Sequence, residues 1–227
     1  TVPPDTSSAP VNCLVSVKAV DITDTGVTLH MPNDTLQMYA YLGDAKISNG
    51  QFDLARESYS VESLRLVEGK LNYDIIFQPQ LKGLDYNHLA LSDIRLSVDS
   101  IFYCAPDARL KIVECSMKEK SGIVLSSLTG GIALDSTKVS LPRMTLTTPD
   151  SNVEMECDMD LNAFDVKNPG KVYLRFFAEI GKQDVMRFAG DMPQQFIMRY
   201  PNHPISVRLS LNGNMNHARI SAFDVSL

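Results

Sequence analysis

The sequence predicts an all-β protein built on a curved antiparallel sheet, and three observations lead to that prediction. Apolar and polar residues alternate in one run after another, which is the period of a β-strand. Turn-forming residues separate these runs at intervals of about 8–12 residues, the spacing of antiparallel strands. The alternation also slips by one residue inside some runs, as it does at a β-bulge. By this pattern we expect roughly 14 strands of about 6–10 residues each.

The chain begins with TVPPDTSSAP, a composition typical of a flexible linker. We therefore divide it into a linker over residues 1–12 and a single elongated domain over residues 13–227. The 227 residues, 44% of them hydrophobic, suffice for one sizeable core or two small domains. No signal peptide opens the chain, and it ends at ISAFDVSL, inside a strand-like pattern. We expect it to be a piece of a longer protein.

Turn-forming residues mark the ends of the predicted strands, and a shift in the apolar alternation within a strand indicates a bend. Asn-Gly and Pro-Asp pairs favour tight reversals. Leu89 and Leu91 have the opposite parity to Ile94, so we place a β-bulge between them and expect the sheet to curve. The expected reversals lie at residues 24–26, 48–50, 68–70, 106–107, 129–131, 149–150 and 212–214.

One segment departs from the strand period. In residues 181–201 the apolar positions recur at spacings of three and four, as in an amphipathic helix. Pro193 suits the first turn of a second short helix. We therefore expect a short helix pair near residues 181–200, between two strands.

The segment SNVEMECDMDL (151–161) has one apolar face and one acidic face. Its acids, Glu154, Glu156, Asp158 and Asp160, resemble a calcium site in number. Same-face residues in a strand lie about 6.6–6.8 Å apart, whereas calcium ligands must converge to about 2.3–2.6 Å from the ion. We therefore expect the acids to face solvent, where charge discourages sheet-to-sheet stacking, and we expect no metal site.

No pattern indicates catalysis. The chain contains no G-x-S-x-G, H-E-x-x-H, P-loop or G-x-G-x-x-G pattern, so we expect no enzyme activity and no cofactor. A hydrolase that uses a pair of carboxylates stays open, because a sequence does not show whether two acids converge. The 21 basic residues are scattered singly against 27 acidic ones, which argues against a nucleic-acid partner.

The four cysteines, Cys13, Cys104, Cys115 and Cys157, form no C-x-x-C pair, so neither a zinc ribbon nor thioredoxin chemistry has support. Cys104 and Cys115 flank the turn APDAR. A simple hairpin there sets Cys104 opposite about residue 110, so a disulfide between them requires a shifted register. Small buried side chains are the favoured interpretation, and the disulfide stays open.

The apolar face of the sheet has two interpretations. A closed sandwich buries it against a second sheet, and periodicity alone favours that. A curved sheet that does not close leaves a groove instead, and a large exposed apolar surface marks a binding site. The residues that would line such a groove are Val153, Met155, Cys157, Met159, Leu161, Val172, Leu174, Phe176, Ala178, Ile180, Ile205, Val207, Leu209 and Leu211.

Several sequence segments favour the open groove over the closed sandwich. GQFDLARESYSVESLRLVEGKLNYD (50–74), NHLALSDIRLSVDSIFY (87–103) and residues 117–164 resemble the β-repeats of AsmA-like and TamB-like proteins. GKQDVMRFAGDMPQQF and YPNHPISVRLSLNGNMNH resemble them too, so the likeness covers roughly residues 45–227. The pattern is similar to that of Bacteroidota members of the translocation and assembly module subunit TamB family.

The resemblance implies a fold and a function. Family members form a β-taco, an open half-pipe with an apolar interior, and extend through the periplasm from an inner-membrane anchor. They are thought to carry phospholipid between the inner and outer membranes, and some assist outer-membrane assembly with a β-barrel partner. We therefore expect a periplasmic, bridge-like lipid-transfer segment whose partner is phospholipid. We expect contact with the inner membrane through an anchor, and with a β-barrel partner through further regions, to involve parts of the longer protein outside this sequence. The alternative is a surface-exposed β-sandwich, of adhesin or glycan-binding type.

Overall fold

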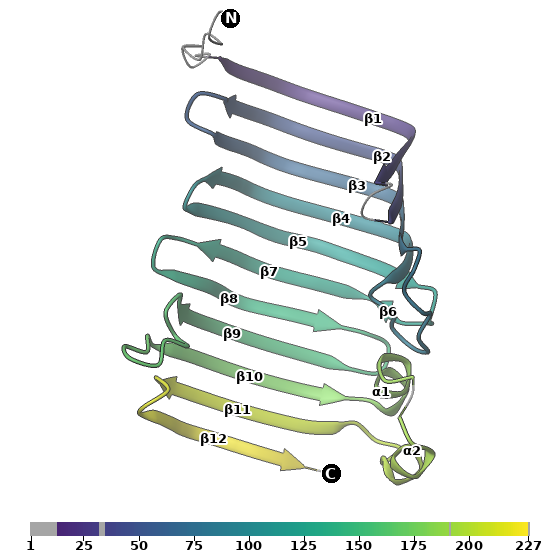
Figure 1. Ribbon diagram of the computed structural model, residues 1–227, viewed down its shortest axis with the longest axis vertical. Helices are drawn as coiled ribbons and strands as arrows, with labels where there is room; N and C mark the ends of the chain where they lie inside the picture. Colours follow the sequence, from purple (N-terminus) through teal and green to yellow (C-terminus); the bar gives the residue numbers. More distant parts are fainter. Residues whose placement is uncertain (1–12, 32–34, 191, 227) are drawn as a thin grey trace, which may run out of the picture.

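The computed structural model describes residues 13–31, 35–190 and 192–226, so the linker expected over residues 1–12 lies outside the described residues. One antiparallel sheet of 12 strands makes up most of this part of the chain (Figure 1). The strands are β1 (Leu14–Met31), β2 (Leu36–Asp53), β3 (Ser58–Ile75), β4 (His88–Cys104), β5 (Asp107–Glu119), β6 (Val124–Leu125), β7 (Ser127–Leu134), β8 (Lys138–Thr147), β9 (Asn152–Asp160), β10 (Val172–Ile180), β11 (Ile205–Gly213) and β12 (Ala218–Ser226). The predicted all-β class is confirmed.

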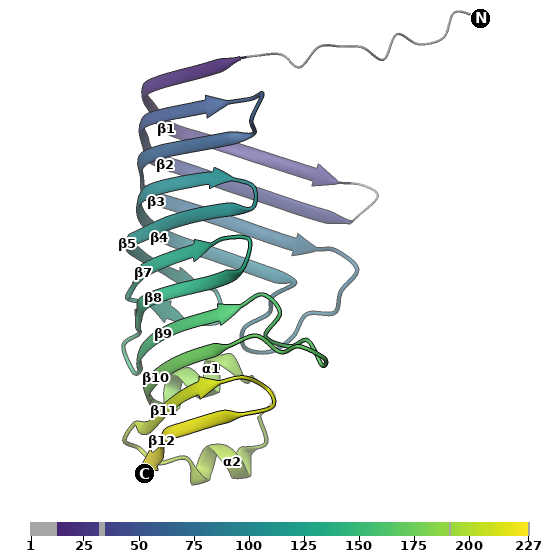
Figure 2. The same ribbon diagram turned by 90° about the vertical axis from the view of Figure 1, so that its left-hand side faces the viewer.

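The strands follow one another through the sheet in chain order, with β6 paired only to β5. β1 and β12 lie at opposite ends and do not pair with each other, so the sheet is curved but unclosed (Figure 2). Eleven strands on this path, about 4.8 Å apart, give a sheet about 50 Å long. The 14 predicted strands would have given about 65 Å.

Four strands are much longer than predicted because several expected reversals are corners inside continuous strands. β1 to β4 have 17 or 18 residues each. The signals at 24–26, 48–50 and 68–70 lie within β1, β2 and β3, where Asp24, Asn49 and Glu68 have φ angles of 48°, 49° and 61°. The signal at 129–131 likewise lies within β7. The reversals predicted at 106–107 and 149–150 are confirmed as connections between strands, and the one predicted at 212–214 lies at the end of β11, where the connection to β12 begins.

The main corner crosses the first four strands as a row. Register places Asp24 of β1 beside Gly43 of β2, and Glu68 and Asp93 occupy the corner in β3 and β4. Pairing shifts between Ser92 and Arg95, which confirms the bulge predicted between Leu91 and Ile94. A left-handed residue turns the chain without ending the strand, so the sheet bends along this row.

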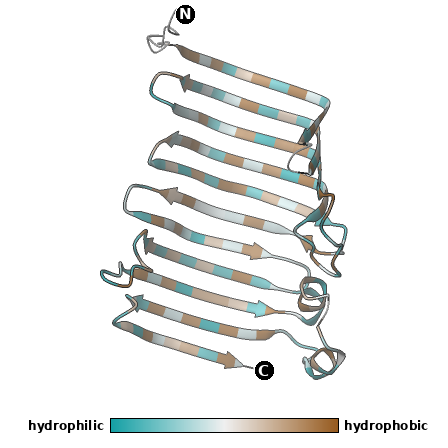
Figure 3. Cartoon of the chain, viewed as in Figure 1, coloured by the Kyte–Doolittle hydropathy of each residue, from teal (hydrophilic) through white to brown (hydrophobic). Residues whose placement is uncertain are grey.

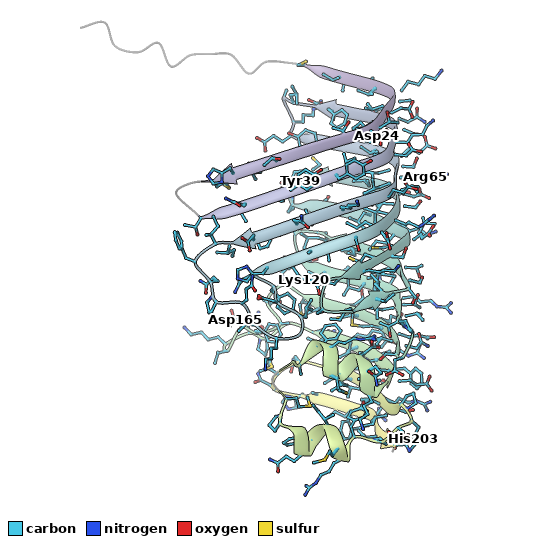
Figure 4. All side chains as sticks on the ribbon, turned by 90° about the vertical axis from the view of Figure 1, so that its right-hand side faces the viewer. Asp24, Tyr39, Arg65, Lys120, Asp165 and His203 are labelled. Carbon is cyan, nitrogen blue, oxygen red and sulfur yellow. The ribbon has the colours of Figure 1, made fainter. Side chains whose placement is uncertain are left out.

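The corner divides the half-pipe into two walls. The first wall contains β5, β7 to β12 and one half of each of β1 to β4. These halves are the ones that end at Leu14, Asp53, Ser58 and Cys104. The second wall contains the rest of β1 to β4, as far as Met31, Leu36, Ile75 and His88. Asp24 and Arg65 lie on the convex side of the bend (Figure 4), so the neighbours of Arg65, Leu64 and Leu66, point to the concave side.

Two helices lie beyond the second wall, toward the C-terminal end of the sheet (Figures 1 and 2). They are α1 (Lys182–Phe188) and α2 (Gln194–Arg199), and the predicted helix pair is confirmed. They follow β10 at the side where the second wall stands in β1 to β4. A β-bridge joins Gly83, in the β3–β4 loop, to Ala189 after α1. We call residues 76–87, 182–190 and 192–200 together the second rim.

The sheet has a single layer, and its interior is correspondingly small. Among the described residues, the buried apolar ones are Ala45, Val98, Cys115, Ile123, Ala163 and Ala178. All four cysteines are free, and Asp107, not a residue near 110, pairs with Cys104. Cys115 is buried, and burial raises the pKa of its thiol. Most apolar side chains of the strands are half-buried on one face of the sheet.

The close approach at the corner gives a first prediction. A Cβ added at Gly43 would lie 2.8 Å from the Glu68 Cβ and 3.0 Å from the Glu68 backbone oxygen. Gly43→Ala should therefore lower the free energy of unfolding by about 1–3 kcal/mol, measured by urea denaturation. Gly26→Ala is the matched control in β1, where the added Cβ meets only the movable Tyr39 ring at 3.3 Å. Equal losses in the two variants would contradict the corner assignment.

Candidate functional site

The concave face carries rows of apolar side chains that cross from strand to strand. Register aligns Met155 of β9 with Phe176 of β10, and Phe176 with Leu209 of β11. Parallel rows run beside it: Cys157–Leu174–Leu211, Val153–Ala178–Val207, Met159–Val172 and Ile180–Ile205. Figure 3 shows the alternation of apolar and polar residues along the strands. Thirteen of the fourteen residues predicted to line a groove thus lie on one face.

Leu161 is the exception. β9 ends at Asp160, and Leu161 begins the connection to β10, where it is exposed. The backbone N–H of Leu161 donates to Thr137 O at 2.7 Å, and that of Ala163 donates to Asp160 O at 2.9 Å. These bonds turn the chain away from the strand, so the period-two pattern continues one residue further than the strand itself.

The sequence interpretation missed most of the same face. The rows extend through β8 by Leu141 and Met144, and through β12 by Val225, Phe223 and Ile220. In the first wall of β1 to β5, two further rows are Ile22–Ala45–Leu66–Leu96–Cys115 and Val20–Ile47–Leu64–Val98–Ile112. Each of these strands alternates with period two, but each changes phase at a corner. If the apolar alternation is assigned separately on each side of a residue with a left-handed backbone conformation, the sequence predicts these rows.

No second sheet covers this face in the described part of the chain, which forms a single sheet. Most of the apolar side chains are therefore half-buried by their neighbours along the rows, and several of those on the edge strands are exposed. Val27 and Leu29 of β1 and Phe223 of β12 are among the exposed ones. The face is an open apolar trough that runs the length of the sheet.

The convex face is polar, and three of its acids on β9, Glu156, Asp158 and Asp160, have a partner. Arg175 lies 3.5 Å from Glu156, and the Ser140 hydroxyl donates to Asp158. The Lys171 backbone N–H donates to Asp160 Oδ2 at 2.7 Å. Within the described residues, no group of three or more His, Cys, Asp or Glu side chains is placed to hold a metal ion.

Two shallow depressions are lined mainly by polar residues of the sheet. One, of about 810 Å³, is at the main corner and is lined by Tyr41, Lys70, Asp93 and Lys118 among others. The other, of about 870 Å³, crosses β8 to β12 and includes Glu156 and Arg175. Each contains one ion pair: Lys118 lies 2.8 Å from Asp93 in the first, and Arg175 lies 3.5 Å from Glu156 in the second. Neither depression isolates two acids in an apolar pocket, as a carboxylate-pair hydrolase requires.

The comparisons with known proteins add no assignment. No protein-family model, curated protein or solved structure matches the chain. Within the described residues, no helix combines the length and the apolar character needed to cross a membrane. The chemistry of the site therefore has to be argued from its own residues.

Polar side chains tie the second rim to the sheet. The Asp85 carboxylate, only 1% exposed, accepts from the backbone N–H of Leu81 at 2.8 Å and of Asn87 at 3.0 Å. The hydrogen bond from Leu81 is the main cause that lowers the pKa of Asp85. These bonds fold the β3–β4 loop back on itself.

His88, at the start of β4, holds the same loop through both ring nitrogens. Nδ1 contacts the Asp74 carboxylate, and Nε2 lies 2.9 Å from the Gln78 carbonyl oxygen. Both partners are acceptors, so the doubly protonated imidazolium satisfies both contacts at once. The hydrogen bond with Asp74 raises the pKa of His88, and burial opposes it.

α1 is held by a similar buried acid. Asp184 Oδ2 accepts hydrogen bonds from the hydroxyls of Thr148 and Ser151, the latter at 2.6 Å. At the other end of the segment, the Tyr200 hydroxyl donates to Ile180 O at 2.7 Å, and Lys182 Nζ donates to Tyr200 O at 3.2 Å. The helix pair is therefore fastened at both ends to the strands that precede it.

The His88 contacts predict a pH dependence of stability. Because its pKa is raised in the folded state, the contribution of His88 is complete below its unfolded pKa of about 6.5 and is lost as pH rises through the folded value. Urea unfolding of the wild-type chain should show this loss above pH 6.5, and His88→Gln should remove it. His30→Gln, at an exposed position on β1, is the control. An unchanged pH profile in His88→Gln would contradict the assignment.

Proposed function

We propose that the concave face binds phospholipid acyl chains and conducts them along the sheet, while the head groups stay in water at the open side. The observation that carries the proposal is an apolar face about 50 Å long over which the described chain places no second layer. Each acyl CH₂ group that leaves water gains about 0.8 kcal/mol, so this face favours long apolar chains over polar ligands.

The rows of the trough support movement as well as binding. They run across the strands, along the length of the sheet, so an acyl chain meets a similar apolar environment from one strand to the next. Met155, Met159 and Met144 are unbranched and polarisable, which suits an occupant that changes shape. Such conduction requires no catalytic group and no cofactor.

The resemblance to AsmA-like and TamB-like proteins supports the same function. We propose that the chain is a periplasmic segment of a bridge-like lipid-transfer protein that extends from an inner-membrane anchor toward the outer membrane. On this proposal a β-barrel partner in the outer membrane would contact other regions of the longer protein. The alternative, a β-sandwich of adhesin or glycan-binding type, requires two packed sheets, and the described residues form one.

Adjacent phenylalanines on β10 allow a direct test of lipid contact. Phe176 lies in the trough, opposite Met155 and Leu209, whereas Phe177 lies on the convex face with Arg208 over its ring at 5.6 Å. A photo-crosslinking amino acid at position 176 should form phospholipid adducts in cells, detected by mass spectrometry. The same residue at position 177 is the control. Absence of adducts at 176, or equal yields at both positions, would count against the trough and favour protein or glycan binding.

A charge in the trough should block lipid. Leu209→Glu introduces a carboxylate into the apolar row, where its desolvation opposes the approach of an acyl chain. We expect the lipid recovered per mole of purified protein to fall about tenfold. Ser210→Glu, the next residue on β11, points to the convex face beside Arg175 and should leave lipid content unchanged. Circular dichroism should remain β-rich in both variants; equal lipid content in both would refute the assignment.

A further inference from the structure

The second rim has the reverse of the usual distribution of polar and apolar side chains. Its described acids, Asp85 and Asp184, are 1% and 4% exposed. Its large apolar residues point outward: Phe77, Phe196 and Met198 are 79%, 62% and 74% exposed, and Leu81, Tyr86 and Phe188 are exposed as well. In water the opposite arrangement is favoured, since apolar surface is best buried and carboxylates are best solvated.

This arrangement is held in place. Asp85 and His88 fasten the loop of residues 76–87, while Asp184 and Tyr200 fasten the helices. The bridge between Gly83 and Ala189 joins the loop to the residue that follows α1. Figure 4 shows the helices on the side of the molecule that also carries the convex face of the second wall. The apolar side chains are therefore presented outward by a hydrogen-bonded framework.

Among the described residues of the rim, the exposed charges are positive. Lys82 and Arg199 are exposed, and Arg187 is half-exposed, while the described acids of the rim are buried. The chain as a whole has a net charge of −6, so the described part of the rim is a local exception. Large apolar side chains flanked by lysine and arginine are the combination that binds the interface of an anionic bilayer.

We propose that the second rim docks on the surface of an anionic phospholipid bilayer, with its phenylalanine and methionine side chains among the acyl chains. The exposed side chains of Phe77, Leu81, Phe188, Phe196 and Met198 together offer on the order of several hundred Å² of apolar surface for such a contact. The rim adjoins the second wall, so a docked bilayer lies beside the trough. The role of this contact as a lipid entrance rests on the proposed function; the docking itself does not.

Vesicle co-sedimentation of the whole chain tests the docking. The wild-type chain should sediment with vesicles of phosphatidylglycerol and phosphatidylethanolamine, and less with pure phosphatidylcholine. The variant Phe188→Ser/Phe196→Ser/Met198→Ser should lower the partition coefficient at least tenfold. Lys82→Ala/Arg199→Ala should weaken binding only to the anionic vesicles.

A matched control lies on the opposite edge of the half-pipe. Leu161, Phe164 and Val166, in the connection between β9 and β10, are also exposed and lie outside the rim. Leu161→Ser/Phe164→Ser/Val166→Ser should bind vesicles like the wild type. Equal losses in the two triple variants, or no sedimentation of the wild-type chain, would overturn the proposal. Self-association of the wild-type chain in sedimentation velocity, abolished by the rim variant in the absence of vesicles, would assign the surface to a second copy instead.

The outcomes also separate the two proposals. Vesicle docking without lipid adducts at position 176 would leave the rim proposal standing and refute lipid conduction. Adducts at position 176 without docking would refute the rim proposal alone.

Discussion

The structure depends on one geometrical constraint: a strand that turns a corner must keep its apolar side chains on the inner face. A bend that inserts one extra residue shifts the alternation by one position. Apolar residues that kept strict alternation through such a bend would point to the outer face beyond it. At the main corner a left-handed residue takes up the extra position, and the phase changes there by one residue. Ile22 before the corner and Val27 after it thus both contribute to the concave face, although their numbers differ in parity.

The residue types at the corners reflect that constraint. Asp24, Asn49 and Asp93 belong to the types that tolerate the left-handed region through local hydrogen bonds. Glu68, with φ of 61°, has no such advantage, and a non-glycine residue in this conformation costs roughly 1–2 kcal/mol. Pairing along the long strands offsets that cost. The result is a sheet that bends without closing, with apolar residues inside and charges outside.

The sequence predicted the fold class well because alternation and turn chemistry are local signals. It predicted the strand count less well, because Asp24-Thr25-Gly26 and Ser48-Asn49-Gly50 have the composition of a hairpin turn but lie in corners. The difference is set by whether the next strand pairs back immediately, which depends on tertiary packing. The groove residues of β9 to β11 could be predicted because the apolar residues of each of these strands keep the same alternation from end to end. The exposed apolar residues of the second rim had no such signal: the apolar spacing in residues 181–201 predicts helices, but not which of their side chains meet solvent.

The central claim is that the concave face is left uncovered by protein and is occupied by lipid. Native mass spectrometry of the chain, purified under mild conditions, tests this most directly. We predict charge-state series displaced by the mass of one or more phospholipids, which collapse to the bare protein after organic extraction. A single unshifted species before and after extraction, from a protein that retains its β-rich circular dichroism, would contradict the account.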